Sequence, residues 1–195
     1  MTDAQAGYIF AQAPNEVERL QSWAHSWEPE TETMLDRIQV QPGWRTIDLA
    51  CGPLGIIDSL SRRVGSTGSV VAADLNPSML SAARSYAETN GFNNVEFVEA
   101  SAYQSGLPPA SFDLVHARFM LAPLGRDEAL LDEMIALARP GGIVASQESD
   151  ESGVFATHLS LPGSVSSSSR WQPLPAAAGI TAPGGALTGC SGRQV

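Results

Sequence analysis

Apolar residues recur along the chain with two different periods, and the change of period separates predicted helices from predicted strands. Between residues 16 and 39 the spacing is helical, which predicts one or two amphipathic helices broken near Pro29. From residue 45 onward, short runs rich in Val, Ile and Ala alternate with longer amphipathic segments. The predicted strands are 45–50, 69–74, 95–99, 112–117 and 143–147, and the predicted helices are 56–64, 77–90 and 127–139.

This alternation predicts the α/β class. Two helix ends carry clear signals, because Pro77 opens one helix and the Pro140-Gly141-Gly142 run stops another. At least five short strands separated by helices indicate a parallel sheet covered by helices on both faces. With right-handed crossovers this becomes a Rossmann-like, doubly wound αβα sandwich. Ligands of such sheets bind beyond the carboxyl ends of the strands, so the residues that follow each strand are the candidates for function.

Composition narrows the classes of function. The 195 residues carry a net charge of -10, which argues against nucleic acid or an anionic membrane as partner. All 11 positive residues are Arg, so no Lys base or Schiff base is available. The two cysteines have no zinc-ligand spacing, and no metal site is predicted. The N-terminus lacks a signal-peptide pattern and no long apolar run occurs, so we expect a cytoplasmic protein.

The first predicted strand leads into a turn with small residues at Ala50, Gly52 and Gly55. Such residues permit a sharp backbone turn and close approach of a ligand, although a tight turn alone could also require them. The turn departs from the dinucleotide fingerprint, because Ala50 replaces its first glycine. Asp48 lies inside the strand, and a buried carboxylate needs a partner. The amino group of a ligand's amino-acid moiety could be that partner.

Asp74 ends the second predicted strand, 22 residues after Gly52. A carboxylate at this place can accept hydrogen bonds from both ribose hydroxyls. Alternatively it opens the turn before Pro77 and caps the following helix. Together with the glycine turn upstream, the ribose interpretation is the stronger one.

Four segments in this order, 46–55, 71–80, 111–118 and 137–142, resemble motifs of the class I S-adenosylmethionine (SAM) methyltransferases. The resemblance spans roughly residues 43–150 and is strongest to the small-molecule branch typified by the ubiquinone/menaquinone-biosynthesis methyltransferases. It implies SAM as cofactor. It also implies that Asp48 and the turn hold the methionine part of SAM, that Asp74 holds the ribose and that Leu75 lies against the adenine. The implied cofactor-binding residues are Asp48, Ala50, Cys51, Gly52, Gly55, Asp74, Leu75, Ser101 and Ala102.

One position departs from the family pattern. After the third strand the family usually has an Asp that accepts from the adenine amino group, whereas this chain has Ser101-Ala102. A hydroxyl cannot supply a charge-assisted contact, so we expect weaker SAM binding.

Methyl transfer from a sulfonium mainly requires alignment, and a weakly acidic acceptor also needs a base. His116, at the end of the fourth strand, is the candidate general base, or else a structural residue bonded to backbone. Arg118 could bind an acidic substrate group or pair with a surface carboxylate. Tyr8 resembles a lid tyrosine of related enzymes, although a single Tyr more often simply packs.

The acceptor class follows from a missing motif. The segment 116–119 lacks the Asn/Asp-Pro-Pro-aromatic sequence of base- and amide-directed enzymes, which leaves a small-molecule acceptor. The sequence thus predicts a SAM-dependent methyltransferase. The alternatives are a catalytically impaired SAM- or nucleoside-binding remnant and, less favoured, a nicotinamide-dependent oxidoreductase.

Three regions follow: a helical N-terminal cap region (1–42), a SAM-binding domain (43–150) and a tail (151–195). The tail is rich in Ser, Gly, Pro and Ala and has no acidic residue after Glu151. We expect it to be disordered and without strands. Family members continue to seven strands, so the final strands are predicted to be missing and 143–147 to be an uncovered edge. A frameshifted or truncated gene product is the hypothesis that fits this composition.

Overall fold

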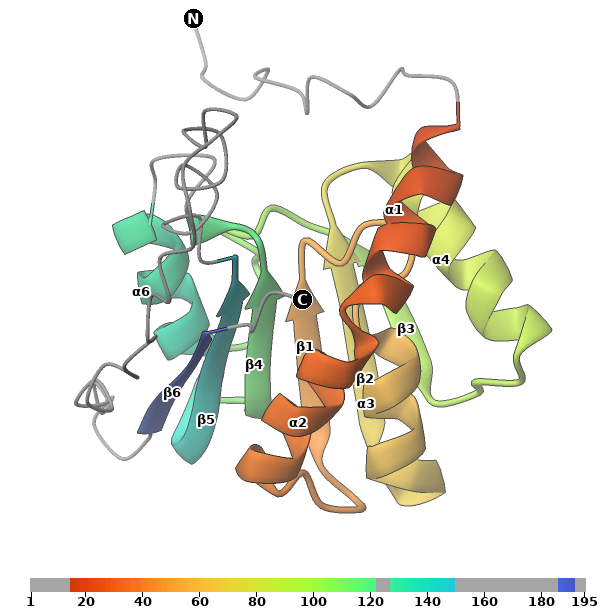
Figure 1. Cartoon of the computed structure of the whole chain (residues 1–195). Helices are drawn as coiled ribbons and strands as arrows, with labels where there is room; N and C mark the ends of the chain where they lie inside the picture. Colours follow the sequence, from red (N-terminus) through yellow and green to blue (C-terminus); the bar gives the residue numbers. More distant parts are fainter. Residues whose placement is uncertain (1–14, 122–126, 150–185, 192–195) are drawn as a thin grey trace, which may run out of the picture.

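Parallel strands alternate with helices along the chain (Figure 1). The computed structural model describes residues 15–121, 127–149 and 186–191. Within these ranges the sheet has six strands in the order β3-β2-β1-β4-β5-β6. The strands are β1 (Arg45–Leu49), β2 (Ser69–Asp74), β3 (Val95–Glu99), β4 (Phe112–Arg118), β5 (Ala138–Glu148) and β6 (Ala186–Ser191). The helices are α1 (Glu16–Ser26), α2 (Glu28–Ile38), α3 (Ile57–Val64), α4 (Pro77–Thr89) and α6 (Asp127–Leu137), with a 3-10 turn at Gly65–Thr67.

The order of the strands reverses at β1, which pairs with β2 on one side and with β4 on the other. The carboxyl ends of these three strands therefore meet at the topological switch point, where ligands of open α/β sheets bind. Asp48 of β1 lies in register with Ala72 of β2 and with His116 of β4. The predicted α/β, doubly wound class is confirmed.

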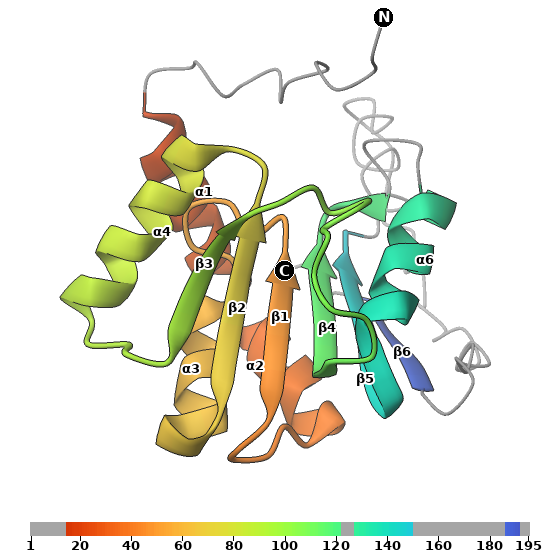
Figure 2. The ribbon, with the colours of Figure 1, turned by 180° about the vertical axis from the view of Figure 1, so that it is seen from behind.

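Helices cover both faces of the sheet. Successive residues of a strand point to opposite faces, so Val70 packs with α2 and α3 whereas Val71 packs with α6. Figure 1 shows α1, α2 and α3 on one side of the sheet, and Figure 2, from behind, shows α6 on the other. The predicted αβα sandwich is confirmed.

The described helices are short, and α4 is the longest with 13 residues. The predicted helical region at the N-terminus consists of two helices, α1 and α2, with the break at Trp27 and Pro29 in the first turn of α2. Within the described ranges, no helix combines the length and the apolar character needed to cross a membrane.

The boundary between α6 and β5 differs from the prediction. The sequence predicted a helix to residue 139 that is stopped by Pro140, whereas α6 ends at Leu137 and β5 begins at Ala138. Ala138 pairs with Phe112, and the register shifts between Phe112 and Leu114. A Cβ at Gly142 would lie 2.8 Å from the Phe112 carbonyl oxygen, so this glycine allows the close pairing. Pairing with β4 therefore extends the strand through a segment that resembles a turn in the sequence.

The expected uncovered edge of the sheet is also corrected. Our prediction contained no strand after residue 151, but β6 pairs in parallel with β5 from Ile143↔Ala186 to Glu148↔Ser191. Edge pairing satisfies backbone groups and does not require a regular apolar pattern, so a strand of this kind carries no signal in the local sequence. The remainder of the predicted tail lies outside the described residues.

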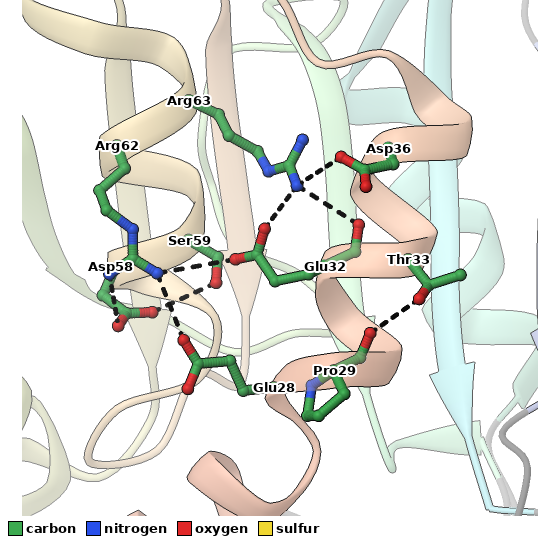
Figure 3. Close-up of polar contacts among 9 residues, drawn as sticks. All are labelled: Glu28, Pro29, Glu32, Thr33, Asp36, Asp58, Ser59, Arg62 and Arg63. Carbon is green, nitrogen blue, oxygen red and sulfur yellow. Dashed lines mark hydrogen bonds and ion pairs between the residues drawn. The ribbon is translucent and has the colours of Figure 1, made fainter.

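An ion-pair network joins α2 to α3 (Figure 3). Arg63 lies 2.7 Å from Asp36 and also pairs with Glu32. Burial alone would raise the pKa of Glu32, but hydrogen bonds from Ser59 and Arg63 and the charges of Arg63 and Arg62 lower it below its ordinary value. A carboxyl whose pKa is lowered by folding stabilises the fold above its unfolded pKa, and this contribution is lost as pH falls through the folded pKa.

We predict that Arg63→Gln lowers the free energy of unfolding at neutral pH by up to about 1 kcal/mol, because the network is partly exposed. The difference from wild type should shrink as pH falls below the folded pKa of Glu32. Urea unfolding at neutral and acid pH measures both effects. Arg37→Gln is the control, since Arg37 is exposed on α2 and forms no ion pair within the described residues. An equal loss in both variants would contradict the assignment.

Candidate functional site

The turn after β1 is shaped by a buried carboxylate. Asp48 is 1% exposed, and its Oδ2 accepts a hydrogen bond of 2.9 Å from the backbone N–H of Ile56. Its Oδ1 lies 2.7 Å from His116 Nδ1. An ionised carboxylate only accepts, so His116 donates from Nδ1. The partner that the sequence required for Asp48 is therefore found within the chain, on the neighbouring strand.

The backbone of this turn is left-handed at three positions, Ala50, Gly52 and Gly55. At Gly55 the space is also closed, because a Cβ would overlap Asp48 Oδ2 and lie 3.0 Å from the Cys51 carbonyl oxygen. At Gly52 a Cβ would meet nothing within 4 Å. Gly55 is thus required by the carboxylate, whereas Gly52 leaves open space on the side where a ligand could approach.

Asp74 connects the end of β2 to the same turn. Its Oδ2 accepts from Gly52 N–H and its Oδ1 from Asn76 N–H, both at 2.8 Å. Asn76, and not Asp74, caps α4, because its side chain accepts from Ser78 N–H at 2.9 Å. Burial raises the pKa of Asp74, the backbone donors oppose this rise, and the charge of Asp48 adds to it. The capping alternative therefore belongs to Asn76, and Asp74 holds the two turns together.

Leu75 follows directly and is 61% exposed. Among the described residues, Leu75 and Trp23 are the large hydrophobic side chains that the fold leaves exposed. A single exposed leucine is ordinary, but here it stands next to a carboxylate at the switch point. The arrangement offers an apolar surface beside a hydrogen-bond acceptor.

Ser101 and Ala102 follow β3 and complete the row of strand ends. The Ala100 N–H donates to the Asp74 carbonyl at 3.1 Å, which brings this turn beside the end of β2. Ser101 Oγ accepts from Tyr103 N–H at 3.2 Å, and Ala102 is buried. The structure thus brings together Asp48, the glycine turn, Asp74 and Ser101, as the sequence predicted from their places after strands.

Cys51, within the turn, is a buried free thiol. Burial raises its pKa well above the ordinary value, and the charges of Asp48 and Asp74 raise it further. The side chain therefore stays protonated near neutral pH and acts as a small packing residue.

His116 and Arg118 lie two residues apart on β4 and therefore point to the same face of the sheet. His116 is 0% exposed, and its Nε2 has no hydrogen-bond partner among the described residues. Arg118 is partly buried and donates from Nη2 to the Gly55 carbonyl at 3.0 Å. This geometry gives His116 a structural partner, and its role as a general base stays a prediction. Tyr8 lies outside the described residues.

The sequence reasoning missed Glu148, at the end of β5. Its Oε1 accepts from the N–H groups of Met120 and Leu121, both at 3.1 Å, and from Ser146 Oγ at 2.9 Å. Like Asp74, it is an acidic residue at the end of a strand, and that shared position was the available signal. Glu148 fixes the backbone directly after Phe119. Phe119 itself has a positive φ of 57°.

Phe119 in turn anchors α1. Its ring stacks on Trp23 with centroids 4.8 Å apart, and it meets Trp27 edge to face at 5.1 Å. Such pairs stabilise packing beyond their burial of area. The α1–α2 corner is thereby held against the end of β4.

We predict that Gly55→Ala destabilises the fold by several kcal/mol, because a Cβ there meets Asp48 and the backbone conformation is left-handed. Gly52→Ala is the matched variant, since it has a similar positive φ but open space, and it should cost about 1–2 kcal/mol. Thermal unfolding of both variants measures the difference. If both variants lose the same stability, the left-handed backbone conformation alone requires Gly55.

We predict that His116→Leu costs about 3–5 kcal/mol, because it leaves the buried Asp48 carboxylate without its side-chain donor and with the Ile56 N–H alone. His116→Asn retains a donor of similar reach and should restore part of this loss. Urea unfolding separates the two variants. If both unfold like wild type, Asp48 does not depend on His116.

The chain is similar in sequence to known methyltransferases. A family model described as a methyltransferase domain matches residues 41–185. The ubiquinone/menaquinone biosynthesis C-methyltransferase UbiE of Hahella chejuensis is 38% identical over 109 residues, which cover 55% of this chain and 44% of that protein. The demethylmenaquinone methyltransferase of Geobacillus kaustophilus is 30% identical over 124 residues, which cover 64% of this chain and 53% of that protein. The chain therefore spans about half the length of these curated relatives.

Solved structures agree on the fold. A SAM-dependent methyltransferase from Aquifex aeolicus superposes with a TM-score of 0.58 at 22% identity, covering 65% of this chain and 69% of that chain. Given the family match over most of its length, the chain belongs to the methyltransferase-domain family.

Proposed function

We propose that this chain binds SAM across the carboxyl ends of β1, β2 and β3 and transfers the methyl group to a small-molecule acceptor. The observation that carries the proposal is that the carboxylate of Asp74 lies next to the exposed apolar side chain of Leu75. Asp74 is held by Gly52 and Asn76, and the neighbouring Leu75 is exposed on the same turn. A carboxylate beside an apolar side chain fits a ribose beside an adenine.

The residues present fit the cofactor. Asp74 still has lone pairs for hydroxyl donors after its two backbone contacts, because a carboxylate offers about four acceptor sites. Gly52 leaves room above the turn. Ser101 offers a hydroxyl where an adenine edge would lie, and we propose that it supports binding less strongly than a carboxylate.

SAM would supply an activated methyl group on a good leaving group, and the chain would mainly bind and orient. Both oxygens of Asp48 already accept hydrogen bonds, from His116 and from the Ile56 N–H. Asp48 would therefore hold the shape of the turn, and the backbone of the turn, not Asp48 itself, would contact the ligand. Phe119 and the α1–α2 corner cover the end of β4 and help to exclude water from it.

The small-molecule acceptor is supported by two observations. The acidic net charge disfavours nucleic acid, and the curated relatives named above are quinone-biosynthesis enzymes by name. We propose an acceptor of that size class and leave its chemical identity to a substrate screen.

Calorimetric titration with S-adenosylhomocysteine (SAH) tests the proposal, with Leu75→Ser as the diagnostic variant. Because Leu75 is mostly exposed, the substitution should leave the melting temperature unchanged. It should weaken SAH binding about tenfold, since the lost apolar contact is worth about 1.4 kcal/mol.

The control is Ser85→Ala on the exposed side of α4, which should bind like wild type. A folded protein that binds NAD but not SAH would overturn the proposal in favour of an oxidoreductase. Binding of SAH without any transfer from SAM across an acceptor panel would favour the impaired remnant.

A further inference from the structure

The turn after β3 lies at the base end of the proposed cosubstrate site. It is joined to the end of β2 by the hydrogen bond from Ala100 N–H to the Asp74 carbonyl, at 3.1 Å. Asp74 is also paired in register with Glu99, the last residue of β3. A nucleoside with its ribose at Asp74 and its base against the exposed Leu75 would therefore place an edge of the base next to Ser101.

The half-buried hydroxyl of Ser101 has one fixed contact in this turn. Its Oγ accepts from Tyr103 N–H at 3.2 Å, two residues further along the chain. A hydroxyl has one donor hydrogen and two acceptor lone pairs, so the hydrogen and one lone pair are still available to a ligand. Ser101 can therefore donate to a ring nitrogen of a base or accept from an exocyclic amino group.

The other side chains at this end of the site are poorly suited to read an amino group. Leu75 and Ala102 are apolar, and Ala102 is buried. Glu99 is exposed, and a hydrogen bond to an exposed carboxylate adds little because water competes for both partners. Among the described residues around this turn, Ser101 is therefore the side chain that decides how the amino group of a base is read.

We propose that Ser101 leaves the amino group of the base unselected, so that the cosubstrate site also accepts a purine that lacks this group. A carboxylate at the same place could only accept and would require an amino donor, whereas a hydroxyl rotates to suit a donor or an acceptor. When the amino group is absent, the hydroxyl donates to the neighbouring ring nitrogen and regains a contact. The inference rests on the proposed function and specifies which part of the cosubstrate that site recognises.

The local turn allows a matched pair of variants. Asp and Asn side chains accept from the backbone N–H two residues further on, as Ser101 does here, so Ser101→Asp and Ser101→Asn should both retain the contact with Tyr103 N–H. The two side chains have nearly the same shape and differ in the group that is left for a ligand. This group is an acceptor oxygen in Asp and a donor NH₂ in Asn.

Calorimetric titration compares SAH with 6-deamino SAH, in which hydrogen replaces the amino group of adenine. Both ligands carry the same charge, so the ratio of their dissociation constants cancels any general effect of an added carboxylate. Wild type should prefer SAH by no more than about threefold, because the hydroxyl can exchange one partner for another. Ser101→Asp should raise this preference to about 10- to 100-fold, because its hydrogen bond is charge-assisted. Ser101→Asn should remove or reverse the preference.

A wild-type preference for SAH of tenfold or more would overturn the inference, because another acceptor, such as Glu99, would then read the amino group. The same ratio in wild type and in both folded variants would also overturn it, because Ser101 would then lie away from the base. Asp74→Asn is the control and should weaken both ligands equally, since they share the ribose. If folded wild type binds neither ligand, the proposed function fails and the inference with it, whereas SAH binding with the wrong ratio refutes the inference alone.

Discussion

The architecture of the site depends on one buried carboxylate. Asp48 of β1 contacts His116 of β4 through one oxygen and the Ile56 N–H through the other. A buried charge is stable only when its hydrogen bonds are satisfied, so these contacts fix the turn relative to two neighbouring strands. Gly55 follows from the same constraint, because any side chain there would overlap Asp48. Gly55 is thus a consequence of the carboxylate, whereas Gly52 is not.

Much of this could be predicted from the sequence. The bounds of β2 and β3 agree with the pattern of apolar residues, because these strands are short and end at clear turns. The pattern also identified Asp48, an acidic residue inside a buried strand, and Asp74, an acidic residue at the end of one. The bond between Asp48 and His116 joins residues 68 positions apart, and only the pairing of β1 with β4 reveals it.

The features that the sequence did not predict also depend on contacts between distant segments. A Pro-Gly-Gly run normally ends an element, but pairing with Phe112 draws residues 138–142 into β5. The segment 186–191 lacks a strand pattern, yet it meets the open edge of β5. Both strands form through backbone pairing with a distant partner, which a local pattern cannot show. Glu148 was missed for a related reason, since its partners are backbone N–H groups after β4.

The negative charge at the switch point bears on the ligand that the proposed function requires. Asp48 and Asp74 place negative charge beside the glycine turn, and each affects the titration of its neighbours. Arg118 reaches the Gly55 carbonyl of the same turn, where the charges of Asp48 and Asp58 act on it. With the proposed function, the sulfonium and the ammonium group of SAM would lie near this negative charge. A low-dielectric site makes such attraction stronger than it would be in water, so the two carboxylates bear on affinity and orientation alike.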